Sequence, residues 1–224
     1  RFDFTKGFTN TSGDGWAYDQ SRIDILNRMA NVIWDLDPTD RPYIILEHLA
    51  DNSEETVLAN NGMLLWGNMN HPYRENGMGW HNGDGSDLSN GLYTTRGWTY
   101  PNLVTYMESH DEERMMYSAR KYGNQTQSPD YDVQDIPTAL DRMAAAAAFF
   151  IPLKGPKMIW QFGELGYDIS INGCSDDIDD TSEDCRTSAK PVHWDYYDDP
   201  DRYGLYRTYA TINSLKTQNE VFNS

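Results

Sequence analysis

The chain has 224 residues, a formal net charge of −17, 38% hydrophobic residues and 13% aromatic residues. This length suits one domain or a large part of one, and the hydrophobic fraction is sufficient for a packed core, which argues against a disordered chain. The negative charge repels phosphate backbones and anionic lipid, so nucleic acid is not an expected partner. No apolar run reaches the ~18 residues of a spanning helix, so membrane insertion is not expected either.

Short apolar runs alternate with helical patterns along the chain, and this order predicts β–α units around a parallel sheet. In chain order we expect a strand at 1–5, a helix with its N-cap at Ser21 that ends at Asp37-Pro38, a strand at 43–46, a short helix at 54–59, a strand at 62–66, a long polar stretch at 68–100, a strand at 103–107, a helix at 136–150, a strand at 156–160 and a helix at 203–215.

Five strands, each followed by a loop or helix, suit a segment of an eight-stranded (β/α)8 TIM barrel, which usually needs ~250 residues or more. Five strands cannot close such a barrel. A complete, open doubly wound sheet is therefore the structural alternative.

Three of the expected strands end in a carboxylate, namely Asp3, Glu47 and Asp111. Buried strands rarely end in acids without a reason, because an unpaired buried carboxylate is costly. Acids presented together suit cleavage of a glycosidic bond, in which one carboxylate attacks or stabilises the anomeric carbon and another protonates the departing oxygen. Arg1 lies two residues before Asp3, on the same side of a strand, where it can pair with the attacking carboxylate.

Several segments resemble, in the same order, motifs of the α-amylase family, glycoside hydrolase family 13. Arg1-Phe2-Asp3-Phe4-Thr5-Lys6 is similar to the fourth-strand motif, and Tyr43-Ile44-Ile45-Leu46-Glu47 is similar to the fifth. Tyr106-Met107-Glu108-Ser109-His110-Asp111 resembles the seventh-strand motif. The turn after the eighth strand is matched by Gly163-Glu164-Leu165-Gly166, and the stretch that often follows it by Lys190-Pro191-Val192-His193-Trp194-Asp195.

The resemblance implies a retaining hydrolase of α-glucans such as starch and maltooligosaccharides, with no cofactor needed for the chemistry. Asp3 would be the nucleophile, Glu47 the acid and base, and Asp111 the transition-state stabiliser. The substrate-binding residues would be Arg1, Lys6 and His110. Residues 1–224 would then form the C-terminal part of the barrel, about strands 4 to 8, without its N-terminal strands or the family's C-terminal β-sandwich.

One departure from the family concerns calcium. Gly7 stands where many members have a histidine whose carbonyl helps to hold a structural calcium, although the Gly7 carbonyl could still serve. The histidines show no metal-site spacing, so we assign no metal ligand. Trp66, Trp80 and Trp98 are candidate sugar platforms, and core packing is the alternative for each.

Cys174 and Cys185 bracket an acidic loop, and a local disulfide in a secreted or periplasmic protein is favoured over two free thiols. An α-glucosidase or glucan transglycosylase would share every motif, and a non-catalytic glucan-binding descendant or an inactive fragment is a further alternative. Residues 1–224 by themselves are expected to have little or no hydrolytic activity. A half barrel would expose sheet edges, which favours self-association.

Overall fold

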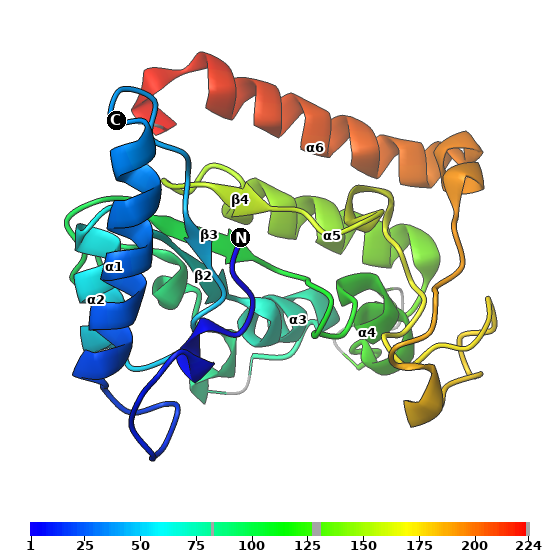
Figure 1. Cartoon of the computed structure of the whole chain (residues 1–224). Helices are drawn as coiled ribbons and strands as arrows, with labels where there is room; N and C mark the ends of the chain where they lie inside the picture. The colour runs from blue at the N-terminus through cyan, green and yellow to red at the C-terminus, as the bar shows by residue number, and fades with distance from the viewer. Residues whose placement is uncertain (82, 127–130, 223–224) are drawn as a thin grey trace. The chain divides into compact units, whose positions relative to one another are not determined.

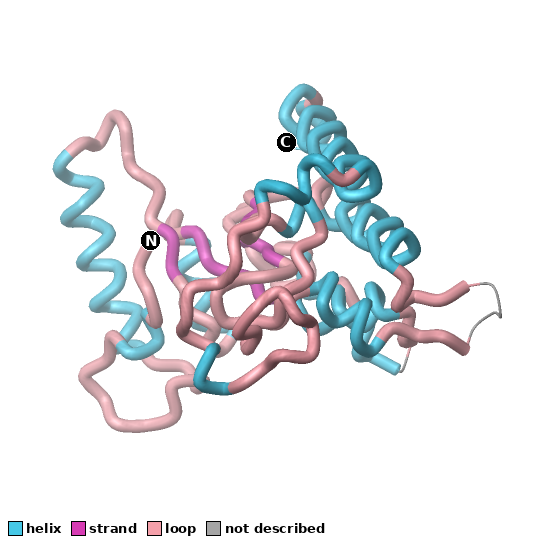
Figure 2. Tube along the Cα trace, turned by 90° about the vertical axis from the view of Figure 1, so that its right-hand side faces the viewer, coloured by secondary structure: helices cyan, strands magenta, loops and turns pink. Residues whose placement is uncertain are grey.

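The computed structural model describes residues 1–81, 83–126 and 131–222. Within them lies a parallel sheet with the strand order β1-β2-β3-β4, flanked by helices. Its strands are Ile45–Leu46, Leu64–Asn68, Leu103–Tyr106 and Lys157–Met158. Figure 2 shows how short these strands are beside the helices and loops. The expectation of an α/β fold with a parallel sheet is thus confirmed.

The chain divides into two compact units. Unit 1 comprises Arg1–Asn68, Ser89–Thr105 and Lys154–Pro156. Unit 2 comprises the other three segments, Met69–Leu88, Tyr106–Leu153 and Lys157–Ser224.

In unit 1, helices α1 (Gln20–Leu36) and α2 (Asn52–Asn60) pack side by side (Figure 1). Strand β1 pairs in parallel with β2, with Ile45 opposite Leu64. Helix α1 buries apolar residues three or four positions apart, which places them on one helix face. This face joins the buried strand residues in the unit 1 core, which includes Ile23, Leu26, Ala30, Trp34, Leu46 and Leu65.

The beginning of unit 1 differs from the expectation in two ways. The predicted strand at 1–5 is reduced to one parallel bridge between Phe2 and Leu46, because Phe4 has φ 47° and turns the chain into a 3₁₀ turn at Thr5–Gly7. The N-cap of α1 is Asp19 and not Ser21. The Asp19 carboxylate accepts hydrogen bonds from two backbone N–H groups of the first turn, which satisfies donors that a helix end leaves open.

In unit 2, four helices surround an apolar core: α3 (Asn70–Met78), α4 (Met115–Tyr122), α5 (Ile136–Phe150) and α6 (Pro200–Gln218). The expected bounds of α5 are confirmed, and its buried alanines allow α6, α3 and α4 to pack closely against it. Helix α6 begins earlier than expected, at Pro200, and is capped by Asp199. Helices α3 and α4 were not expected, because α3 lies in the polar stretch and has few aliphatic residues.

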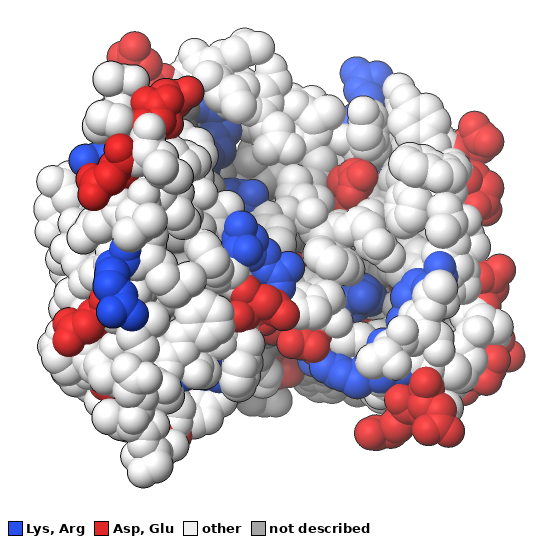
Figure 3. All heavy atoms as spheres, in the orientation of Figure 1, with Lys and Arg blue, Asp and Glu red and all other residues white. Residues whose placement is uncertain are grey.

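The predicted disulfide between Cys174 and Cys185 is present. Nearby, the buried Asp168 carboxylate binds Arg120, Arg202 and the Tyr196 hydroxyl. Acidic side chains are numerous on the face seen in Figure 3, as the net charge of −17 requires. No helix in the described part of the chain combines the length and the apolar character needed to cross a bilayer.

Candidate active site

One guanidinium of unit 1 holds two carboxylates. Arg1 Nη2 lies 2.5 Å from Asp3 Oδ1 and 2.5 Å from Glu47 Oε2. A carboxylate oxygen of Asp3 and one of Glu47 lie within 4.8 Å of each other. The Asp3 side chain is 73% exposed, whereas that of Glu47 is only 11% exposed. The structure therefore brings Arg1, Asp3 and Glu47 together, with one carboxylate open to solvent and the other largely buried.

Backbone pairing next to β1 fixes this arrangement. Phe2 N–H donates to the Ile45 carbonyl at 2.8 Å, and Glu47 N–H donates to the Phe2 carbonyl at 3.0 Å. Phe2 packs against the unit 1 core. Because side chains alternate along an extended segment, Arg1 and Asp3 both point to the side opposite Phe2. The alternation expected from sequence thus survives although the strand is only a bridge.

Trp66 on β2 supports the Arg1 guanidinium, whose central carbon lies 4.4 Å from the centre of the Trp66 ring. The Trp66 side chain is buried, so it acts as a backing for Arg1 through a cation–π contact. Trp98 is also buried, in the unit 1 core. Trp80 of unit 2 is partly buried and donates through Nε1 to the Tyr122 carbonyl. Core packing therefore describes Trp66 and Trp98 better than an exposed sugar platform.

Lys6, predicted to bind substrate, lies on an exposed aromatic side chain. Its Nζ is 3.4 Å from the centre of the Trp16 ring and 5.5 Å from that of Phe4. Phe4 is 61% exposed and Trp16 is 62% exposed. Phe4 and Trp16 were not among the predicted site residues. Their positions in the sequence could have suggested a role in the site. Phe4 directly follows the candidate nucleophile Asp3, and Trp16 lies in the glycine-rich loop that comes next.

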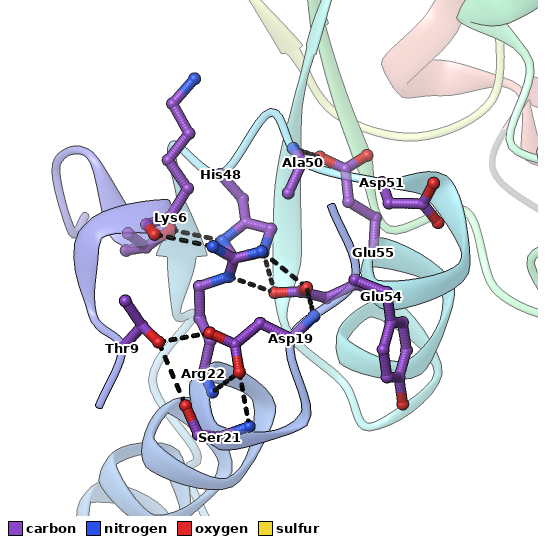
Figure 4. Close-up of polar contacts among 12 residues, drawn as sticks. Lys6, Thr9, Asp19, Ser21, Arg22, His48, Ala50, Asp51, Glu54 and Glu55 are labelled. Carbon is purple, nitrogen blue, oxygen red and sulfur yellow. Dashed lines mark hydrogen bonds and ion pairs between the residues drawn. The ribbon is translucent and has the colours of Figure 1, made fainter. Parts of the chain in front are cut away.

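Below this surface lies a buried polar network that the sequence analysis missed (Figure 4). The Glu54 carboxylate receives Arg22 Nε at 2.6 Å, Arg22 Nη2 at 2.8 Å, His48 Nε2 at 2.7 Å and the Asp19 N–H at 2.8 Å. The side chains of Arg22, His48 and Glu54 are at most 1% exposed. Burial alone would raise the pKa of Glu54, but the bonds from Arg22, Asp19 and His48 outweigh burial and lower it.

Burial of His48 and the contacts of its ring indicate which nitrogen carries the proton. Burial lowers the pKa of His48, despite the nearby Glu54, so the ring is neutral near pH 7. A neutral ring beside the charged Glu54 carboxylate must carry its proton on Nε2. The other ring nitrogen, Nδ1, then accepts from the Thr5 hydroxyl, whose oxygen is 2.9 Å away.

The Thr5 hydroxyl, the His48 imidazole and the Glu54 carboxylate are linked in the same order as the catalytic triad of many hydrolases. Here Thr5, His48 and Glu54 are all fully buried, so a substrate carbonyl cannot reach the Thr5 oxygen. The row is thus unsuited to nucleophilic catalysis and serves to join segments of the chain.

A second buried carboxylate of α2, Glu55, pairs with Arg96 Nη1 at 2.9 Å and accepts the Ala50 N–H at 3.2 Å. Burial raises the pKa of Glu55 to about 7, although Arg96 and the backbone donors oppose the rise. Glu54 and Glu55 are neighbours with different partners. This contrast makes Glu55 a useful reference for Glu54.

In unit 2, His110 and Asp111 form the second part of the predicted site. His110 Nε2 lies 3.5 Å from Asp111 Oδ2, and Arg186 Nη2 donates to Asp111 Oδ1 at 3.1 Å and to its carbonyl at 3.0 Å. The His110 ring lies 6.1 Å from that of Trp160, between centroids. Arg186 directly follows Cys185, so the disulfide restrains the segment that delivers this guanidinium to Asp111.

Glu108 is a further buried acid of unit 2, three residues before Asp111. Its Oε1 accepts the Met115 N–H at 2.6 Å, at the first turn of α4. A Cβ on Gly163 would lie 2.8 Å from Glu108 Oε2, so the glycine leaves room for this carboxyl. Burial raises the pKa of Glu108 to about 7, opposed mainly by Arg114. Glu108 belongs to the seventh-strand motif but was not a predicted site residue.

The surroundings of Gly7 do not favour a calcium ion. The Gly7 carbonyl accepts the Thr9 N–H at 3.0 Å, and the Lys6 carbonyl accepts Arg22 Nη1 at 2.8 Å. A guanidinium bound to the neighbouring carbonyl would repel a second cation.

The predicted site residues thus fall into two groups. Arg1, Asp3, Lys6 and Glu47 belong to unit 1, and His110 and Asp111 to unit 2. Comparison with protein-family models and with curated proteins finds no match for this chain.

Proposed function

We propose that the chain is part of a retaining glycoside hydrolase that acts on α-glucans, of the α-amylase type. The observation that carries this proposal is the Asp3–Glu47 pair, whose oxygens lie within 4.8 Å on one guanidinium. Retaining glycosidases place their two carboxyl groups ~5–5.5 Å apart, whereas inverting enzymes leave ~6.5–9.5 Å for a water molecule. The short separation favours the retaining reaction.

In the first step, the exposed Asp3 carboxylate attacks the anomeric carbon, and the bond to the leaving sugar oxygen breaks as Glu47 gives that oxygen a proton. In the second step, Glu47 takes a proton from water, the water oxygen attacks the anomeric carbon, and Asp3 is released. Arg1 orients Asp3 throughout, with Trp66 behind it. Its contact with Glu47 must open before Glu47 delivers a proton.

The resemblance to family 13 supports the assignment of the barrel and of the roles of the remaining site residues. We propose that the parallel strands belong to a (β/α)8 barrel, that His110 binds sugar hydroxyls, and that Asp111 stabilises the transition state. Lys6 would bind the substrate. The acidic surface and the disulfide favour a neutral substrate and a location outside the cytoplasm.

The test is the stereochemistry of hydrolysis by the protein that contains this chain. Proton NMR of the first products from maltooligosaccharides should show the α-anomer, and initial release of the β-anomer would refute the retaining mechanism. Asp3→Asn should lower kcat by about 10⁴-fold or more, since the covalent intermediate can no longer form. Asp24→Asn, at an exposed acid of α1, is the matched control and should leave kcat unchanged.

Substrate preference separates the alternatives within the family. Starch should be cleaved faster than maltose, and the reverse order would favour an α-glucosidase. A non-catalytic glucan-binding protein would bind the oligosaccharides without releasing any product.

A further inference from the structure

The two segments that carry the candidate catalytic carboxylates of unit 1 are joined by a buried polar chain. Figure 4 shows its members His48, Glu54 and Arg22. Thr5 lies two residues after Asp3, and His48 directly follows Glu47. Thr5 Oγ1 and His48 Nδ1 are 2.9 Å apart, and His48 Nε2 is 2.7 Å from Glu54 Oε1. A chain of contacts therefore runs from Glu54 to the segment that follows Asp3.

The same two segments also meet through the backbone. Thr5 N–H donates to the Glu47 carbonyl at 2.9 Å, and Thr5 Oγ1 lies 3.1 Å from the same oxygen. The single hydroxyl proton of Thr5 cannot serve Glu47 and His48 at once. With His48 neutral and its Nδ1 unprotonated, the proton goes to His48, and the Thr5 N–H holds Glu47. The protonation state of His48 thus determines how Thr5 is bonded.

A second route reaches the same segment through Arg22 of α1. Arg22 binds both oxygens of Glu54 and donates through Nη1 to the Lys6 carbonyl at 2.8 Å. Glu54 therefore fixes the donors His48 and Arg22, one on each route. Both routes end within three residues of Asp3. It does so from the first turn of α2, where the helix dipole favours a negative charge.

We propose that Glu54 is a positioning residue, which sets the spacing of Asp3 and Glu47 through His48 and Thr5 and through Arg22 and Lys6. This inference rests on the proposed function of the two carboxylates. A buried ion pair is poor evidence for a stabilising role, because apolar residues of similar volume often give equal or greater stability. What a charged carboxylate with four directed donors adds is a fixed geometry, and a pair of catalytic acids requires that.

Amide hydrogen exchange tests the geometry without any reference to catalysis. Glu54→Gln should speed exchange of the Thr5 and Glu47 amide hydrogens by about tenfold or more relative to the rest of unit 1, because their pairing loosens. It should also change the ¹⁵N shifts of the His48 ring, since the partner that fixes the Nε2–H tautomer is lost. Wild-type exchange at both amides in Glu54→Gln would overturn the proposal.

Glu55→Gln is the matched control. Glu55 is the next residue of α2, is equally buried and also pairs with an arginine, but it contacts neither Arg22 nor His48, and its partners are Arg96 and the backbone N–H groups of Leu49 and Ala50. This variant should leave the exchange of the Thr5 and Glu47 amides as in the wild type. Equal acceleration in both variants would mean that a general loss of stability explains the effect, and the proposal would fail.

A smaller change covers the case in which Glu54→Gln does not fold. Thr5→Val removes only the hydroxyl, and Thr5→Ser restores it. We expect faster exchange of the Glu47 amide in Thr5→Val and wild-type exchange in Thr5→Ser. If Thr5→Val exchanges as the wild type does, the hydroxyl does not position Glu47.

Steady-state kinetics on the protein that contains this chain then connect geometry and function. Glu54→Gln should lower kcat on the order of 100-fold with little change in KM, since misplaced reacting groups slow the chemical step. Unchanged kcat in an active protein would overturn the positioning role and leave the hydrolase proposal standing. Absence of hydrolysis in the wild type, with the exchange effects intact, would overturn the hydrolase proposal while the Glu54 network still sets the spacing of the two carboxylates.

Discussion

Replacement of Glu108 by glutamine should change how the stability of unit 2 depends on pH. Burial raises the pKa of Glu108 from 4.5 to about 7. The folded state therefore keeps this proton over a pH range in which the unfolded state has lost it, so the wild type loses stability as the pH rises from about 4.5 to 7. Above pH 7 both states are ionised and the loss is complete.

The size of the effect follows from the difference between the two pKa values. At about 1.4 kcal/mol per pH unit, the rise from 4.5 to about 7 corresponds to about 3 kcal/mol. Glutamine resembles the neutral acid, and its oxygen can still accept the Met115 N–H. Glu108→Gln should thus match the wild type near pH 4.5 and be more stable by about 3 kcal/mol at pH 8.5.

Denaturant unfolding followed by circular dichroism at several pH values measures this difference. Glu220→Gln, at an exposed acid near the end of the chain, is the control and should retain the wild-type pH dependence. If the free energies of unfolding of Glu108→Gln and the wild type stay parallel from pH 4.5 to 8.5, the burial argument for Glu108 is wrong.

Three further predictions concern other parts of the chain. Trp66→Leu removes the aromatic support of Arg1 and should weaken the placement of that guanidinium by about 1 kcal/mol, which should appear as a roughly fivefold loss of kcat/KM in the active protein. Reduction of the Cys174–Cys185 disulfide should destabilise unit 2 by about 2–3 kcal/mol, seen as a lower Tm with reductant, and an unchanged Tm would show that the bridge does not restrain the loop. Because the pKa of His48 is lowered in the folded state, stability should fall as the pH drops below the unfolded value of about 6.5, and thermal unfolding of His48→Gln should show a flatter acid limb.

The sequence was informative where the position of a side chain or a helix follows from the order of neighbouring residues. A carboxylate that comes just after a buried apolar run lies at the end of a strand, and this placed Glu47 directly after β1. The two-residue alternation placed Arg1 on the side of Asp3. Helix α5 was predicted with its true bounds, because its alanine run and the proline in its first turn are local signals.

Other elements depend on contacts that local order does not encode. Helix α3 has few aliphatic residues and buries Asn70, Tyr73, Gly77 and Met78, so its pattern was not recognised as helical. The predicted first strand is shortened because Phe4 adopts a left-handed conformation, which the sequence gives no reason to expect for a phenylalanine.

The buried network shows the same limit at the candidate site. Arg22 and Glu54 are 32 residues apart and sit in the first turns of two helices, where arginine and glutamate are usually solvent-exposed. A glutamate in the first turn of a helix is common, so the position of Glu54 in the sequence gives no sign of its buried contacts with Arg22 and His48.

The sequence by itself determined the α/β class with a parallel sheet, the acid that directly follows β1 and the disulfide pairing that it favoured. These follow from short-range rules of periodicity, turn chemistry and residue order. Only the tertiary structure decided that Arg1 binds both Asp3 and Glu47, that Trp66 supports Arg1, and that Glu54 accepts hydrogen bonds from four donors. Such contacts depend on how distant segments pack, because burial, and not local sequence, determines which charges must find partners.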